Sequence, residues 1–353
     1  MTKPWKDKVG NIQQIGGIET SVVDNGPASG SRVAWFNTGS GLRYKVAIDR
    51  CLDIVDAFYN QHSLAWLSHG GLTMPRPDAN SGFEWLYSFA GGLLTTCGLT
   101  HVGAPESDEG EVRGLHGRIS NIPATVESII QPDPTSGNMD MSITAVIKES
   151  RVFGPHLELR RTLTSTLGES VIKICDEVIN RGNTPCPHML LYHCNFGWPL
   201  VDEGTDIVYK GSCRSRGMDF DNELFNEDHD YKKCQKPLQS HNGSGESCGF
   251  VDMEPDDKGM CQAGLVNHNL PLALVMRYPK NQLPHLANWQ HWGPGEYVCA
   301  LEPGTNPPIG QKKAREQNEL ILLEPGENRK YHLEIQVLSK PDPIQEFVSA
   351  FKS

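Results

Sequence analysis

Three residues that can move protons stand at the ends or turns of strand-like runs. Glu302 closes the apolar run "YVCALE" and is followed at once by the rigid turn "PGTNPP". His193 lies in "LLYHCNFGWPL", where an apolar run carries it inward, and His116 lies in "RGLHGRISNIP", where glycines let the backbone approach a ligand. Each alone is more often a structural residue. Together they supply the proton acceptor and donor that general acid–base catalysis near neutral pH requires.

Two histidines and a carboxylate can also bind iron or zinc. Such sites usually contain a closely spaced ligand pair, whereas these three residues are 77 and 109 positions apart. The spacing does not favour a metal, and we expect none. No serine or cysteine occupies a nucleophile elbow, and no glycine-rich phosphate loop links a strand to a helix. We therefore expect neither covalent catalysis nor a cofactor.

Residues that suit a polyol accompany the three candidates. Trp198, Trp289 and Trp292 offer flat faces for C–H edges. "NWQHW" is equally compatible with an aromatic corner of the core. The candidates for hydrogen bonding to a sugar are Arg50, Asp53, Asn288, Gln290 and His291.

The elements that must position these residues are short and β-type. Runs rich in Val, Ile, Phe, Tyr and Thr, bounded by turn residues, predict strands. They span residues 43–59, 141–150, 157–166, 170–180, 188–197, 271–278, 297–302, 318–324 and 329–339. Helical turns are predicted only at 81–94 and 343–352. Because strands and helices do not alternate, the sequence predicts a large all-β antiparallel sandwich.

No linker or repeat divides the 353 residues, so we predict a single domain over 1–353, with a polar surface excursion at about 212–262. The net charge is −11 without a basic run, which argues against nucleic acid as a partner. The opening stretch "MTKPWKDKVGNIQQIGG" has no apolar segment, and no apolar run is long enough to span a membrane. The ten scattered cysteines are typical of reduced thiols. We expect a cytoplasmic protein without membrane contacts, either a monomer or a homodimer.

The segments around the three candidates resemble the galactose mutarotase (aldose 1-epimerase) superfamily, in the same order. "LHGR", "YHCNFGWPL" and "ALEPGTNPP" are similar to its three catalytic segments. The closest similarity is to a poorly characterised branch, a domain of unknown function, with "DRCLDI", "GGLLTTCGLTHVGAP" and "LHGRISNIP" as landmarks. The resemblance covers roughly residues 40 to 338 and implies a large antiparallel β-sandwich.

The resemblance implies that Glu302 is the base that deprotonates the anomeric hydroxyl and that His193 is the acid that protonates the ring oxygen. His116 would be a second hydrogen-bond donor to the sugar. Well-studied mutarotases carry a "GNR"-type segment after the first histidine, which differs here. Together with Arg50 and Arg118, this difference predicts another monosaccharide, one that carries an acidic group.

Two other readings stay open. The same pair could move a proton from carbon, as in aldose–ketose isomerisation or 2-epimerisation, and deuterium from solvent would then enter at C2. A sugar-binding protein without activity could keep the fold, although binding alone does not need a matched acid and base.

Overall fold

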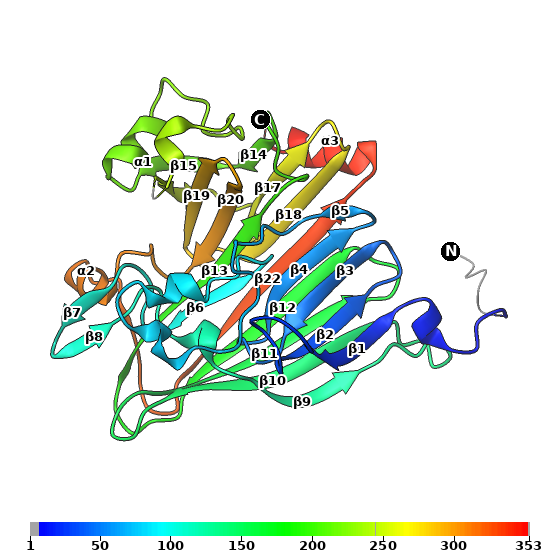
Figure 1. Cartoon of the computed structure of the whole chain (residues 1–353), viewed down its shortest axis with the longest axis horizontal. Coiled ribbons are helices and arrows are strands. Elements are labelled where there is room, and N and C mark those ends of the chain that lie inside the picture. Colours follow the sequence, from blue (N-terminus) through cyan, green and yellow to red (C-terminus); the bar gives the residue numbers. More distant parts are fainter. Residues whose placement is uncertain (1–6, 244, 352–353) are drawn as a thin grey trace.

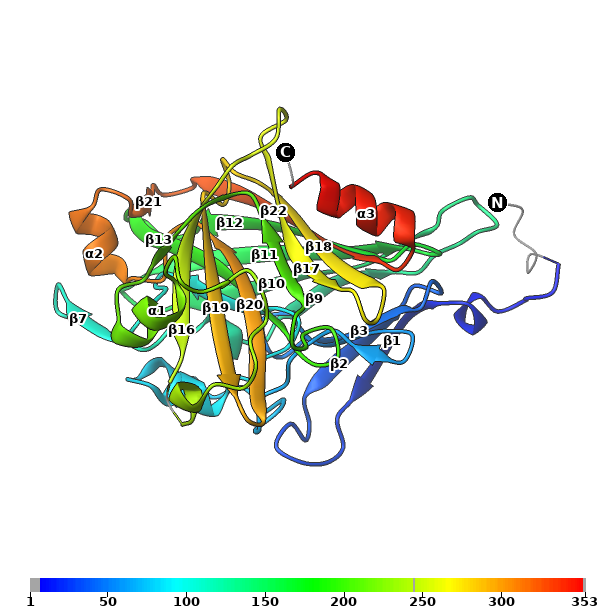
Figure 2. The same ribbon diagram turned by 90° about the horizontal axis from the view of Figure 1, so that it is seen from above.

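The computed structural model describes residues 7–243 and 245–351, and the strands of these residues form two layers (Figures 1 and 2). The first six residues of the opening stretch lie outside the described part. All pairings between neighbouring strands of the sheets are antiparallel. The predicted all-β antiparallel sandwich is therefore confirmed.

One layer is an eight-stranded sheet. Its strands, in spatial order, are β14 (Asp206–Tyr209), β17 (Met260–Asn267), β18 (Leu272–Pro279), β22 (Asn328–Leu338), β12 (Val171–Asn180), β11 (His156–Thr166), β10 (Asp140–Ser150) and β9 (Thr125–Ile130). Long strands with alternating burial, such as β11, bury every second residue against the other layer. Helix α3 (Pro341–Ser349) packs Ile344 and Phe347 on the outer side of β17 and β18.

The second layer combines two sheets. The five-stranded sheet runs β1 (Gly17–Val22), β2 (Arg32–Asn37), β3 (Leu42–Ala47), β4 (Asp53–Tyr59) and β5 (His62–Ser63). The seven-stranded sheet runs β15 (Gly211–Ser215), β16 (Ser247–Met253), β19 (His285–Gly293), β20 (Glu296–Gly304), β13 (Cys186–Phe196) and β21 (Ile321–Leu323), with β6 (Thr95–Leu99) also paired to β13.

One continuous apolar core holds the two layers together. It contains Phe36 from the five-stranded sheet, Leu163 from the eight-stranded sheet and Tyr192 from the seven-stranded sheet. Polar bonds cross the same interface, since the hydroxyl of Tyr192 donates to Asp176 on β12 at 2.7 Å. Tyr192 faces the core, so its neighbour His193 faces outward.

The shorter elements lie in the connections. They are the two-stranded sheet β7 (Glu106–Asp108) and β8 (Glu111–Arg113), helices α1 (Asp219–Leu224) and α2 (Gln311–Glu316), and the 3₁₀ helices η1 (Ile12–Gln14), η2 (Pro77–Asn80), η3 (Glu84–Tyr87), η4 (Ile119–Asn121) and η5 (Gln239–His241). A second apolar cluster covers part of the outer face of β13. It joins Trp85 and Phe89, from η3 and its end, to Leu191.

The predicted surface excursion at about 212–262 has a mixed structure. Residues 216–243 hold α1, η5 and loops, but β16 is an inner strand of the seven-stranded sheet and β17 begins at Met260. The run predicted at 43–59 is divided by a turn into β3 and β4. All ten cysteines are free. None of the described helices is long and apolar enough to cross a membrane.

Candidate active site

His193 and Glu302 are neighbours on adjacent strands. Cys194 of β13 pairs with Leu301 of β20, so the next residues along, His193 and Glu302, lie side by side on the outer face. Nε2 of His193 is 3.3 Å from Oε1 of Glu302. Their exposures are 5% and 3%. The strands thus fix an acid–base pair in a site that solvent barely reaches.

His116 reaches the same place from a tight turn. Its backbone has φ +55°, and Gly117 follows with φ +70°. A Cβ on Gly117 would lie 2.6 Å from the carbonyl oxygen of Gly98, so only glycine fits there. The ring of His116 meets the ring of His193 edge-on, with the centroids 5.9 Å apart. The structure therefore brings the three predicted catalytic residues together.

Aromatic side chains surround the two histidines. Trp85 lies 5.0 Å from His116 between ring centroids. Phe89 and Trp289 lie 5.1 and 5.5 Å from His193. The sequence reading named Trp289 but missed Trp85 and Phe89. The only signal for them was the aromatic density of "FEWLYSF" between glycines.

Burial sets the charge of the pair. It raises the pKa of Glu302 well above its ordinary value, and the charge of Glu246 acts in the same direction while Arg216 opposes it. Burial lowers the pKa of His193 to about 3, although the side chain of Asn195 works against this. In a site of low polarity the neutral forms are favoured. Burial therefore favours the form of the pair in which Glu302 holds the proton and His193 is uncharged.

Several polar atoms of the site have no hydrogen-bond partner among the described residues. They are Nδ1 of His116, Nδ1 of His193 and Oε1 of Glu302, each buried. Burial, with the charges of His193, His101 and Arg216, also lowers the pKa of His116 far below its ordinary value. An unsatisfied buried polar group costs about 1–3 kcal/mol. Such groups gathered at one place are able to hydrogen-bond a polar ligand.

Two charged residues that the sequence reading missed stand beside this site. Arg216 follows β15, and its Nη2 donates to Oε1 of Glu246 at 2.7 Å. Glu246 precedes β16 and accepts a hydrogen bond from the indole nitrogen of Trp289. Neither residue lies in a recognisable motif. The register of β15 and β16 brings them to the site, and a local sequence pattern does not reveal that register.

Arg50 and Asp53, predicted to bind substrate, take part in the scaffold. Every nitrogen of the Arg50 guanidinium donates to an oxygen of Thr73, Ser88 or Ser120. The carboxylate of Asp53 accepts from Thr96 and pairs with the fully buried Arg161 at 3.0 Å. Arg50 therefore fixes the loops around η3 and η4, and Asp53 ties β4 to the eight-stranded sheet. We leave both out of the proposed site.

The alternation of β19 divides the other predicted residues. Trp289 pairs with Ala300 and Ala287 with Glu302, so Trp289 and His291 share the face of Glu302. Asn288 and Gln290 point to the opposite face, where Gln290 donates to Asn288 at 2.7 Å. The amide groups that were predicted to bind the sugar are thus buried in the core.

The remaining predicted residues lie at the margin or elsewhere. His291 is 6.4 Å from Trp289 between ring centroids, and its Nδ1 lies 2.7 Å from the carbonyl oxygen of Glu296. Trp292 is fully buried in the core, whereas Trp198 is 69% exposed. Arg118 is the N-cap residue of η4 next to the His116 turn, and its charge partly opposes the rise that burial causes in the pKa of Glu149. Of these, only His291 and Arg118 are near enough in the fold to border the site.

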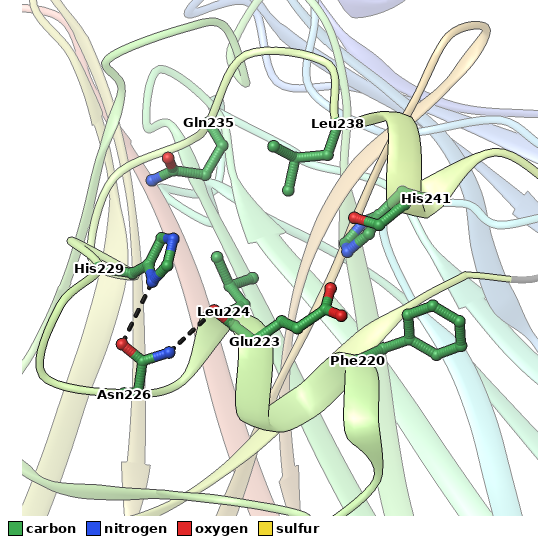
Figure 3. A pocket seen from close by; sticks show the side chains of 9 residues that line it. Phe220, Glu223, Leu224, Asn226, His229, Gln235, Leu238 and His241 are labelled. Carbon is green, nitrogen blue, oxygen red and sulfur yellow. Dashed lines mark hydrogen bonds between the residues drawn. The ribbon is translucent and has the colours of Figure 1, made fainter.

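A separate pocket of about 380 Å³ lies between α1 and η5 (Figure 3). Its lining includes Glu223, His229 and His241, and none of the three predicted catalytic residues. His241 separates it from the site, with its ring 5.6 Å from that of His291. Within the described residues no group of three or more His, Cys, Asp or Glu side chains is arranged to hold a metal ion.

Comparison with solved structures identifies the fold. A structure of a proposed aldose 1-epimerase from Klebsiella pneumoniae superposes with a TM-score of 0.83 at 20% identity, covering 95% of this chain and 88% of the other. A galactose mutarotase-like protein from Clostridium acetobutylicum gives 0.63 at 12% identity, covering 93% and 100%. Galactose 1-epimerase from Lactobacillus acidophilus gives 0.59 at 11% identity, covering 91% and 98%. The fold is that of the galactose mutarotase-like sandwiches.

The family follows from the sequence. Residues 28–337 match the family described as "Domain of unknown function (DUF4432)". The match covers most of the chain, and the protein belongs to this family. No curated protein matches the chain. The predicted resemblance to a domain-of-unknown-function branch of the mutarotase superfamily is therefore confirmed.

Proposed function

We propose that the protein is a cofactor-independent sugar epimerase that interconverts the anomers of a monosaccharide. The observation that carries the proposal is the buried contact of 3.3 Å between Nε2 of His193 and Oε1 of Glu302. An acid and a base at this separation, fixed by paired strands, can both reach a hemiacetal, whose two oxygens are bonded to one carbon.

The pair needs only the proton that it already holds. Its neutral form has the proton on Glu302, because burial raises the pKa of that carboxyl and lowers the pKa of His193. Transfer of this proton to His193 gives a carboxylate and an imidazolium without changing the net charge. Glu302 can then act as base and His193 as acid, which are the roles that the resemblance implies.

The reaction then proceeds through an open-chain sugar. Glu302 accepts the proton of the anomeric hydroxyl, the bond from the anomeric carbon to the ring oxygen breaks, and His193 protonates that oxygen. The pair is now neutral again, with the proton on Glu302. After the carbonyl carbon rotates, the ring hydroxyl attacks its other face, His193 takes the hydroxyl proton and Glu302 returns a proton to the carbonyl oxygen.

The surroundings favour an uncharged sugar. Aromatic faces of Trp85, Phe89 and Trp289 suit the C–H edges of a pyranose. An acidic sugar was expected because of Arg50 and Arg118, but Arg50 is fully engaged by the scaffold. Arg216 is paired with both Asp221 and Glu246, so that cluster carries a formal charge of about −1 and repels an anion. We therefore propose a neutral aldose.

The test is exchange spectroscopy of the purified protein with a panel of neutral and acidic monosaccharides in D₂O. We expect faster exchange between anomer signals for at least one neutral aldose, with no deuterium on carbon. Deuterium at C2 would instead support isomerisation or 2-epimerisation. Binding of a sugar without faster exchange would support a sugar-binding protein.

A further inference from the structure

A buried carboxylate anchors the segment that contains α1 to the seven-stranded sheet. Asp221 is fully buried, and it accepts hydrogen bonds from the backbone N–H groups of Cys248 at 2.8 Å and Met218 at 2.9 Å. Both of its oxygens also accept from the guanidinium of Arg216, at 2.9 Å each. This two-point contact fixes the plane of the Arg216 side chain.

Hydrogen bonds connect Arg216 to the side chains beside the catalytic pair. Its Nη2 donates to Oε1 of Glu246, and the other oxygen of Glu246 accepts from the indole N–H of Trp289. The ring of Trp289 stands edge-on to His193 at 73°. We call Asp221, Arg216, Glu246 and Trp289 the Arg216 cluster. It connects a surface segment to the ring that lies against the catalytic histidine.

Arg216 also lies close enough to act on the charges of the site. Its positive charge opposes the rise in the pKa of Glu302 and contributes to the low pKa of His116. Its side chain is 28% exposed, and Nη1 is the one guanidinium nitrogen without a hydrogen bond among the described contacts. Arg216 therefore stands at the border between the site and solvent.

We propose that Arg216 is a positioning residue for the epimerase: by holding Glu246 against the indole N–H, it fixes the ring of Trp289 beside His193 as the face that receives the sugar. The inference rests on the proposed function. An indole without this anchor can turn about its side-chain bonds, and small misplacements of a bound substrate can lower rates by about 10²-fold. The planar guanidinium of Arg216 can donate hydrogen bonds to Asp221 and Glu246 at once, and a lysine ammonium cannot do this with the same geometry.

A purely structural ion pair would behave differently. Partly exposed pairs contribute little to stability, about 0–1 kcal/mol. Their loss changes how much protein is folded and leaves the folded fraction with its normal activity. A positioning role changes the sugar affinity and the pH profile of molecules that are folded.

The test compares Arg216→Met and Arg216→Lys with a matched control, Arg277→Met. Arg277 has a similar exposure, 30%, and also bonds two acceptors, Glu334 and Gln336, but it lies on the eight-stranded sheet. We expect Arg216→Met to raise KM about tenfold or more, with a smaller fall in kcat, because the sugar loses a fixed contact face. Arg216→Lys should recover part of this loss, and Arg277→Met should resemble the wild type.

The pH profile gives a second readout. Removing the positive charge of Arg216 should shift the loss of activity that follows deprotonation of Glu302 to higher pH, because that charge lowers the pKa of Glu302. The lysine variant, which keeps the charge, should move it less. The other titratable groups whose charges couple to Glu302, which are His193, Glu246 and the thiols of Cys97, Cys194, Cys248 and Cys299, are all retained in the variants.

The indole N–H signal of Trp289, followed by ¹⁵N NMR without any sugar, separates this inference from the proposed function. We expect it to shift and exchange faster with solvent in Arg216→Met, and in Glu246→Gln as a second, milder variant. Unchanged KM, pH profile and indole signal in folded Arg216→Met would overturn the inference. A wild type inactive on every sugar would overturn the proposed function, while the indole signal would still show whether Arg216 fixes Trp289.

Discussion

At the scale of single residues, burial favours the uncharged forms of Glu302 and His193. Burial is the first cause for both, since it raises the pKa of Glu302 and lowers the pKa of His193 to about 3. One shared proton then suffices for a cycle in which base and acid exchange roles. The same burial makes the ionised carboxyl unfavourable, so the site reduces the stability of the fold.

Replacement of Glu302 by glutamine should reveal this cost. Above about pH 4.3 the carboxyl of the unfolded chain loses its proton, whereas the native carboxyl keeps it because its pKa is raised. The native state then binds more protons, so its stability falls as pH rises, by about 1.4 kcal/mol per pH unit until the folded pKa is reached.

We therefore expect Glu302→Gln to be more stable than the wild type at pH 8 and equally stable near pH 4. Denaturant unfolding at the two pH values measures the difference, with circular dichroism as the signal. A variant that is less stable than the wild type at pH 8 would show that the native carboxyl is ionised.

The activity of the pair should persist over a wide pH range. The active form holds one proton, so it is lost only when His193 also becomes protonated or when the pair loses its last proton. The first event has a pKa of about 3, and the second lies above the ordinary carboxyl range. We expect kcat/KM not to fall as pH is lowered toward 5, and to fall on the high-pH side where Glu302 loses its proton, at a pH above the ordinary carboxyl range. A steep fall between pH 6.5 and 5 would indicate that His193 has an ordinary pKa.

At the scale of elements, strand pairing and one turn build the site. β13 and β20 place His193 opposite Glu302, and the turn between β8 and η4 brings His116 to them. Gly117 is the critical residue of that turn, because a side chain there would strike the carbonyl oxygen of Gly98.

Gly117→Ala should therefore lower activity by displacing His116. We expect a loss of about tenfold or more, together with a stability cost of about 1–3 kcal/mol from strain at positive φ. Gly259→Ala is the matched control, since Gly259 also has positive φ but nothing lies within 4 Å of an added Cβ. Both are assayed for anomer exchange and for unfolding. Equal activities in the two variants would mean that the His116 turn is not needed for the reaction.

The sequence predicted the strands that carry His193 and Glu302 better than it predicted the surroundings of the candidate site. The apolar runs ending at Glu302 and passing through His193 are near-continuous, and such runs are recognisable as buried strands. β19 was not predicted, because polar and aromatic residues alternate in it without the usual apolar pattern. Its alternation decides that Trp289 faces the site while Asn288 and Gln290 do not.

Charged residues were the hardest to place from sequence. Arg50 stands in the landmark "DRCLDI", yet its guanidinium is used by backbone and hydroxyl oxygens of the scaffold. Arg216 lies in an unremarkable polar segment, yet it reaches Glu246 and Trp289 through strand register. Such placement depends on contacts between distant parts of the chain, which local sequence patterns do not encode.

At the scale of the whole molecule, the apolar core that stabilises the fold and the candidate site lie on opposite faces of the seven-stranded sheet. The large core lies between the eight-stranded sheet and the other two sheets, whereas the site lies on the outer face of the seven-stranded sheet. Residues 216–243 cover the border of that face, and the net charge of −11 adds a general repulsion of anions. This charge balance supports the proposal of a neutral sugar as substrate.

The most direct test of the proton-transfer pair is anomer exchange measured by magnetisation-transfer NMR, on the neutral aldose that the wild type converts fastest. Glu302→Gln keeps the size of the side chain and His193→Asn keeps a polar group near the position of Nδ1, but neither can pass the proton. We expect both to fold like the wild type and to lower the exchange rate at least 10²-fold, the usual scale for loss of a general base or acid. Exchange at the wild-type rate in either folded variant would contradict the account.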